Sequence, residues 1–157
     1  MRGESSGAAR LSIISNTVLV VGKLGVGLLG GSVSVLSEAV HSGIDLVAAI
    51  IAFFSIRASE TPPDASHPFG HGKVENISAV IEAILIYLAA GLIIYHSVHQ
   101  YLSRQIIASA GLDYGMGIMA VSAVVNFFVS RHLFDVARRT GSPALEADAH
   151  HLRVDVL

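Results

Sequence analysis

The chain has no cysteine among its 157 residues. This absence excludes disulfide bridges, thiolate metal sites and cysteine nucleophiles, so the strong metal ligands left are eight histidines and twelve acidic residues. Charge is also scarce: only 14% of the residues are charged, and they form no basic patch that would suit nucleic acid. With 52% hydrophobic residues and a mean hydropathy of +0.63, the composition predicts an integral membrane protein.

Five apolar stretches predict an all-α membrane protein, a polytopic bundle of about five transmembrane helices. We expect these helices at about 11–29, 32–56, 73–95, 112–129 and 142–157. The last one opens with Ser142 and Pro143, a pairing typical of a helix N-terminus. At about 22 Å it is shorter than a bilayer core of roughly 30 Å, so we expect the chain to stop inside a span.

The remaining segments are polar connections. Residues 1–10 are predicted to form a short tail without the cleavage pattern of a signal peptide. Residues 57–73 hold three prolines and are predicted to form a loop, and residues 99–113 another. Most positive charges lie at the N-terminus, at the first loop and before the final helix, whereas the second loop holds only Arg104. The former are Arg2, Arg10, Arg57, Lys73, Arg131, Arg138 and Arg139. This distribution predicts a multi-pass protein of the plasma (inner) membrane with a cytoplasmic N-terminus.

Two helices carry the same polar pattern inside apolar surroundings. In the second helix, Glu38, His41 and Asp45 lie on one face, and the final helix repeats the pattern with an acid, a histidine and an acid. The repeat consists of Asp148, His151 and Asp155. A histidine and an aspartate one turn apart can reach a single cation. Two such pairs on antiparallel helices supply four nitrogen and oxygen ligands, the donor set that best suits tetrahedral zinc.

The acids that precede each histidine have two possible roles. Glu38 and Asp148 could support the ligands or line the ion path, or each could form a hydrogen bond with a neighbouring helix. His150 points about 100° away from His151 on the helix, so we do not expect it to bind the ion.

Two other charged side chains within the predicted helices also need partners. Lys23 is expected either to extend to the outer membrane interface or to form a buried ion pair with an acid such as Glu82. Glu82 itself is either a proton carrier or a structural hydrogen-bonding group.

The first loop contains a second group of potential ligands. Asp64, His67 and His71 fall within eight residues, and Pro68 and the neighbouring glycines would let the backbone bend around an ion. The alternative interpretation is an ordinary solvated turn.

Taken together, the two His/Asp pairs and the loop segment HPFGHGKVE at 67–75 resemble the cation diffusion facilitators, which export zinc and related divalent metals from the cytoplasm. The resemblance covers nearly the whole chain. It implies a transport site formed by His41, Asp45, His151 and Asp155, and a cytoplasmic loop site formed by Asp64, His67 and His71. It also implies that residues 1–157 are an incomplete transmembrane domain, without the sixth helix and the C-terminal cytoplasmic domain through which full-length members form homodimers.

The predicted ligand set favours transport over catalysis. A catalytic zinc keeps an open position for water, whereas two histidines and two aspartates fill four positions. Because a proton and a metal ion cannot share one imidazole nitrogen, protonation of either histidine would release the metal, which predicts metal/proton antiport with no resident cofactor. A passive metal channel, a membrane-embedded metallohydrolase and a metal-binding protein without transport remain alternatives.

Overall fold

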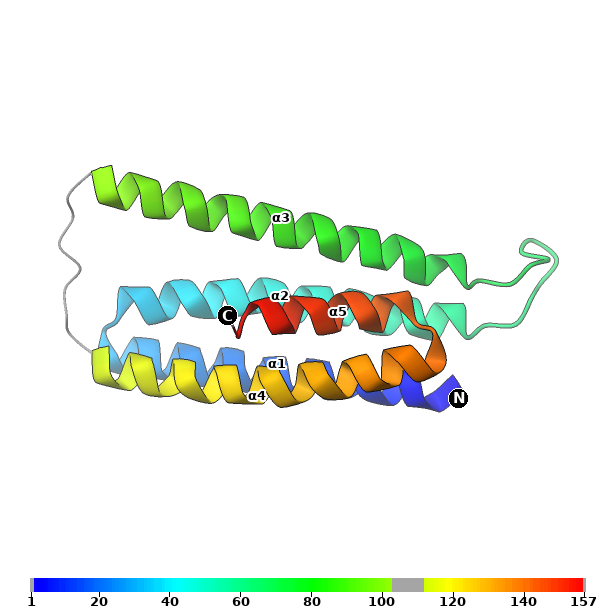
Figure 1. Cartoon of the computed structure of the whole chain (residues 1–157), viewed down its shortest axis with the longest axis horizontal. Coiled ribbons are helices and arrows are strands. Elements are labelled where there is room, and N and C mark those ends of the chain that lie inside the picture. Colours follow the sequence, from blue (N-terminus) through cyan, green and yellow to red (C-terminus); the bar gives the residue numbers. More distant parts are fainter. Residues whose placement is uncertain (1, 103–111, 157) are drawn as a thin grey trace.

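The computed structural model describes residues 2–102 and 112–156, and it contains five helices and no strand within these ranges. The helices are α1 (Arg2–Gly30), α2 (Val33–Ser59), α3 (Lys73–Leu102), α4 (Leu112–Thr140) and α5 (Pro143–Val154). Successive helices run in opposite directions along one long axis (Figure 1). The first four are long and apolar enough to cross a membrane, which confirms the prediction of an all-α polytopic membrane protein.

Helix α5 is different, because its twelve residues span only about 18 Å. It packs against α4 and α3 and ends within the length of the bundle, not at either end (Figure 1). Its start agrees with the prediction: Ser142 is the N-cap, its hydroxyl accepts a hydrogen bond from the Leu145 N–H, and Pro143 follows at the first helical position. Gly141 turns the chain between α4 and α5 with a φ of 68°, a conformation that glycine adopts without strain.

The prediction of a polar N-terminal tail is wrong, because α1 begins at Arg2. The reason is packing: Ala8 and Ala9 are fully buried in a cluster with residues of α2, α4 and α5. Small side chains let the helices approach closely, so tertiary contacts outweigh the polarity of the segment. The Ser6 hydroxyl also donates a hydrogen bond to Glu60 at the end of α2.

The fourth helix is also longer than predicted, because it continues past residue 129 to Thr140. Leu133, Val136 and Ala137 lie at helical spacing and are buried against the N-terminal half of α5. At the other end of the bundle, α3 extends to Leu102. The rest of the predicted second connection, including Arg104, lies at 103–111, outside the described residues.

The exterior of the bundle is apolar and part of its interior is polar, the reverse of a soluble domain. Val40 and Val47 of α2 are 66% and 51% exposed, whereas Asp45 on the opposite face is buried. This arrangement suits a helix that faces lipid on one side and directs its ionisable groups inward.

Candidate metal sites

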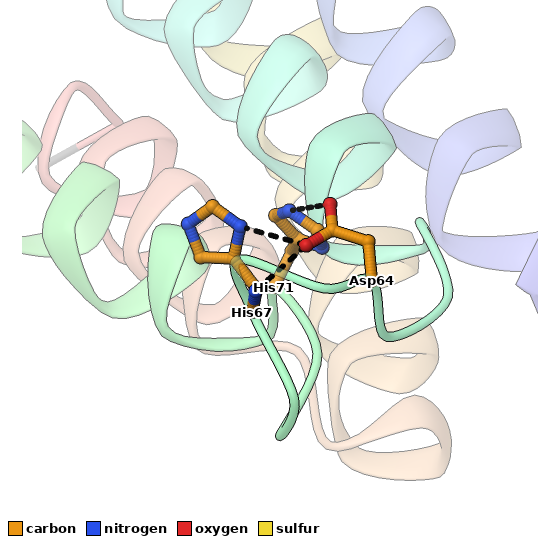
Figure 2. Close-up of side chains that lie close together, drawn as sticks. All are labelled: Asp64, His67 and His71. Carbon is orange, nitrogen blue, oxygen red and sulfur yellow. Dashed lines mark hydrogen bonds and ion pairs between the residues drawn. The ribbon is translucent and has the colours of Figure 1, made fainter.

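The loop between α2 and α3 brings its three predicted ligands together (Figure 2). One carboxylate oxygen of Asp64 lies 3.3 Å from Nδ1 of His67, and the other lies 3.5 Å from Nε2 of His71. The two imidazole rings are 4.3 Å apart between centroids. One potential ligand atom from each residue falls within 4.8 Å of the others, a spacing that a single cation could bridge. We call this group the loop triad.

The local sequence explains how this loop folds. Oδ1 of Asp64 accepts hydrogen bonds from the N–H and hydroxyl of Ser66 and from the N–H of His67. The Gly70 N–H then donates to the His67 carbonyl in a turn that requires a φ of 81° at the glycine. The hydrogen bonds from the Ser66 hydroxyl and the His67 N–H lower the pKa of Asp64 to about 2, so this exposed carboxylate is charged at neutral pH.

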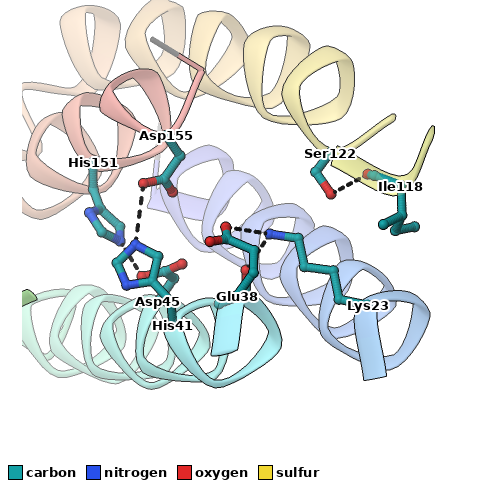
Figure 3. A network of polar contacts seen from close by, with 9 residues as sticks. Lys23, Glu38, His41, Asp45, Ile118, Ser122, His151 and Asp155 are labelled. Carbon is teal, nitrogen blue, oxygen red and sulfur yellow. Dashed lines mark hydrogen bonds and ion pairs between the residues drawn. The ribbon is translucent and has the colours of Figure 1, made fainter. Parts of the chain in front are cut away.

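The intramembrane residues meet where α5 crosses the face of α2 (Figure 3). The two helices run antiparallel, and each contributes one histidine and one aspartate. We call these four residues the four-residue site: His41 and Asp45 from α2, His151 from α5, and Asp155 at the C-cap of α5.

The contacts in the four-residue site run between helices. Nε2 of His151 lies 2.8 Å from Oδ1 of Asp45, and Nε2 of His41 lies 3.9 Å from Oδ1 of Asp155. Potential ligand atoms of His41, Asp45 and Asp155 fall within 4.8 Å of one another. Each histidine therefore faces the aspartate of the other helix. His151 joins the site through Asp45 and is not one of the three residues whose ligand atoms lie within 4.8 Å of one another.

Burial divides the four-residue site into an inner and an outer pair. The side chains of His151 and Asp45 are 8% and 5% exposed, whereas those of His41 and Asp155 are 21% and 17% exposed. Within the described ranges, Nδ1 of His151 has no hydrogen-bond partner. The site is thus enclosed on one side and partly open on the other.

Glu75 fixes the position of α5, a role that sequence reasoning missed. Its carboxylate accepts hydrogen bonds from Ser59 at the end of α2 and from Ser142, the N-cap of α5. It therefore joins three helix ends and sets the starting point from which His151 and Asp155 are placed. Glu75 is the last residue of the loop segment HPFGHGKVE. Its partners lie 16 and 67 residues away in the sequence, so no local sequence pattern predicts these contacts.

One of the two predictions for Lys23, the buried ion pair, is confirmed, but its acid is Glu38 and not Glu82. The side chain neither extends to the membrane interface nor pairs with Glu82, because it is buried between α1 and α2. Its Nζ lies 3.0 Å from Oε1 of Glu38 (Figure 3). It also donates a 2.7 Å hydrogen bond to the Ser42 hydroxyl. Because Lys23 belongs to α1, this contact is the hydrogen bond to a neighbouring helix that is one of the two expected roles of Glu38.

Asp148 has a different environment from Glu38. It is 1% exposed, and within the part of the chain that the structure describes its carboxylate has no hydrogen-bond partner. Glu82 on α3, which packs against α5, is equally buried, and its carboxylate also has no hydrogen-bond partner among the described residues. His150 is exposed, with its ring against Phe134, 4.7 Å between centroids.

Comparison with known proteins identifies the family. The model of the cation efflux transmembrane domain matches residues 9–157. The chain belongs to the cation efflux family. This assignment confirms the resemblance to cation diffusion facilitators and supports a multi-pass membrane protein of a transporter family.

Several curated proteins are similar along most of the chain. An uncharacterized transporter of Synechocystis is 38% identical over 134 residues, which are 85% of this chain and 43% of that protein. The magnetosome protein MamM of Paramagnetospirillum magneticum is 34% identical, with 87% of this chain and 42% of that protein covered. The manganese efflux system protein MneP of Bacillus subtilis is 29% identical, with 95% and 49% covered. The chain spans about half the length of the curated relatives it matches.

Proposed function

We propose that this cation efflux family member exports a divalent metal ion, with zinc as the preferred substrate, through the four-residue site and in exchange for protons. The observation that carries the proposal is the crosswise approach of two histidines and two aspartates from antiparallel helices. Each helix supplies only half of the ligands. A small shift of α5 relative to α2 would therefore be enough to bind or release an ion.

Zinc is the first choice because of the donor set. Two imidazole nitrogens and two carboxylate oxygens match a tetrahedral zinc site, whereas magnesium and manganese favour oxygen ligands. One relative is named for manganese efflux, so the substrate comparison must include manganese as well as cobalt, iron and cadmium.

Proton coupling follows from the same atoms. Nε2 of each histidine faces a carboxylate of the other helix, and this nitrogen can hold either a proton or a metal ion. When the metal ion leaves, protons can take its place and preserve the His/Asp contacts. Exchange of a metal ion for protons is the simplest transport cycle for the site.

The proposed path runs from the loop end of the bundle toward the opposite end. Asp148 lies one turn before His151 on the loop side. It is buried and has no hydrogen-bond partner in the described part of the chain, so it is suited to receive an incoming ion or proton, as is Glu82 on the neighbouring α3. The loop triad would collect metal ions before they reach this point. We assign the loop end to the cytoplasm of a plasma (inner) membrane, because the N-terminus, Arg57 and Lys73 lie at this end.

The complete transport unit is proposed to be larger than this chain. Relatives of about twice the length leave room for a sixth helix and a cytoplasmic domain, and we expect the full-length protein to act as a homodimer. The wide exposed apolar face of α3, which includes Ile84 and Leu88, is available to lipid or to such additional helices.

Metal and proton flux in sealed vesicles tests the proposal. Full-length protein should move zinc against its gradient when a proton gradient is imposed, and should move protons when a zinc gradient is imposed. Zinc flux that ignores the proton gradient would favour a passive channel. Binding without flux would favour a metal-binding protein, and substrate turnover without flux a metallohydrolase.

A further inference from the structure

Lys23 is a buried positive charge beside the four-residue site. It is 3% exposed, although it lies within the membrane-spanning stretch of α1, where an unpaired ammonium group is costly. Its Nζ contacts the Glu38 carboxylate at 3.0 Å and the Ser42 hydroxyl at 2.7 Å. Both partners belong to α2, so the ammonium group is held against the helix that supplies His41 and Asp45.

The contact between Lys23 and Glu38 lies next to the proposed metal ligands of α2. Glu38 lies one turn before His41, on the side away from the loop, and Ser42 lies between His41 and Asp45. Figure 3 shows the Lys23–Glu38 pair next to the four-residue site, along the same face of α2. The Glu38 side chain is 32% exposed, so an ion that leaves the site toward this end would meet it before reaching solvent.

A free carboxylate at this point would hinder release of a dication. Glu38 carries the same charge as the ligands Asp45 and Asp155, and an ion passing it would be attracted a second time. With Lys23 in place, the pair is neutral, and the hydroxyl of Ser42 is already occupied as an acceptor. The neutral pair attracts a dication in the four-residue site less than a free carboxylate would, which keeps the affinity of the site lower.

We propose that Lys23 is a resident counter-cation that occupies the Glu38 position and keeps metal binding weak enough for release. This proposal rests on the proposed function of the four-residue site. Lys23 is a positioning residue in this sense: it does not bind the metal ion but sets the charge that the ion meets next to the site.

The proposal predicts opposite effects for the two halves of the pair. Lys23→Met leaves Glu38 free, so zinc should bind about tenfold more tightly and leave more slowly. Glu38→Gln leaves the positive charge unbalanced, so zinc should bind about tenfold more weakly. The double variant removes both charges and should return affinity to near the parent value. An ion pair that only stabilises the fold would weaken binding in both single variants.

The experiment is a zinc titration of the purified protein in lipid nanodiscs, combined with single-turnover release of bound zinc. Lys73→Met, which removes the same charge from the exposed start of α3, is the matched control and should leave affinity unchanged. Lys23→Arg keeps the charge and should also stay near the parent value.

Each outcome has a defined meaning. Affinity shifts of the same sign in Lys23→Met and Glu38→Gln, or no shift in either, overturn the counter-cation proposal. If Lys23→Met does not fold, Glu38→Gln must still bind more weakly than both the parent and the double variant, and otherwise the proposal fails. A parent protein that binds no metal at the four-residue site contradicts the proposed function itself, which separates the two failures.

Discussion

The two groups of potential metal ligands in this chain contain the same residue types in opposite surroundings. In the loop triad, the Asp64 and His67 side chains are 48% and 56% exposed, and one carboxylate faces two histidines. In the four-residue site, Asp45 and His151 are 5% and 8% exposed, and each histidine has its own carboxylate from another helix. The loop forms from local hydrogen bonds, whereas the intramembrane site exists only when α2 and α5 are packed.

This difference indicates how strongly each site depends on charge balance. Water screens an excess charge in the loop, so the loss of one ligand there changes affinity moderately. In the proposed intramembrane site, two aspartates and a bound dication would form a neutral unit, and any imbalance of charge would be costly in a medium of low dielectric constant. Function should therefore be sensitive to single substitutions in the four-residue site and tolerant of them in the loop triad.

The largest expected effect comes from removing an intramembrane carboxylate. In the full-length protein, Asp45→Ala and Asp155→Ala should each abolish transport, with zinc affinity reduced roughly 100-fold or more, because loss of one partner of a buried charge pair costs about 2–5 kcal/mol. Each protein should still fold, since its partner histidine can become neutral and leaves no buried charge unbalanced. Zinc flux in vesicles and thermal unfolding measure the two properties separately.

Asp135→Ala serves as the control for this pair, because it removes an exposed acid from α4. It should leave both flux and unfolding temperature near the parent values. The four-residue assignment is wrong if either site variant still drives proton-coupled zinc flux near the parent rate, or if both variants fail to fold.

A smaller effect is expected when the donor set changes but the number of ligands does not. His41→Asp gives the site three carboxylates and one imidazole, so selectivity should move toward manganese or cadmium and zinc should bind about tenfold more weakly. Competition between metals in the vesicle assay measures this shift. An unchanged selectivity profile would show that His41 does not choose the ion.

The loop triad should tolerate a more severe change. The double variant His67→Ala and His71→Ala removes two of its three ligands, so metal binding at the loop should be lost while transport continues at a reduced rate. The ligands lie outside the spanning helices, which is why flux does not require them. Zinc binding by this variant and its initial flux rate check the expectation, and complete loss of flux in a folded protein would contradict it.

Sequence reasoning located the features that repeat or follow a period. The polar stripe on α2 and its repeat on α5 predicted which residues would face each other, and the prolines and glycines predicted the loop. Two kinds of feature were out of reach. The N-terminal helix depends on the burial of Ala8 and Ala9, and the crosswise pairing of His41 with Asp155 depends on the rotation of two helices about their axes.

The pairing of Lys23 shows the same limit more sharply. Hydropathy predicts the helix that contains Lys23, and the cost of a buried ammonium group predicts an acid near it. Only the packing of α1 against α2 decides that this acid is Glu38 and not Glu82. Local pattern thus predicts which groups need partners, and the three-dimensional arrangement decides which partners they have.

The smallest expected effect is a pH transition confined to the loop triad. Hydrogen bonds lower the pKa of Asp64 to about 2, below the value of about 3.9 for an unfolded aspartate. A lowered pKa means that the carboxylate stabilises the folded loop fully above the unfolded value and loses this contribution as the pH falls through about 2. The amide resonances of Ser66 and His67, which donate to Oδ1, should therefore show no transition near pH 4 and a transition near pH 2 in the protein in detergent micelles. In Asp64→Asn the same resonances should show no transition in this range, because the amide does not titrate. A midpoint near 4 in the parent would mean that these hydrogen bonds do not hold the loop, and that the loop triad is not arranged for a cation before one binds.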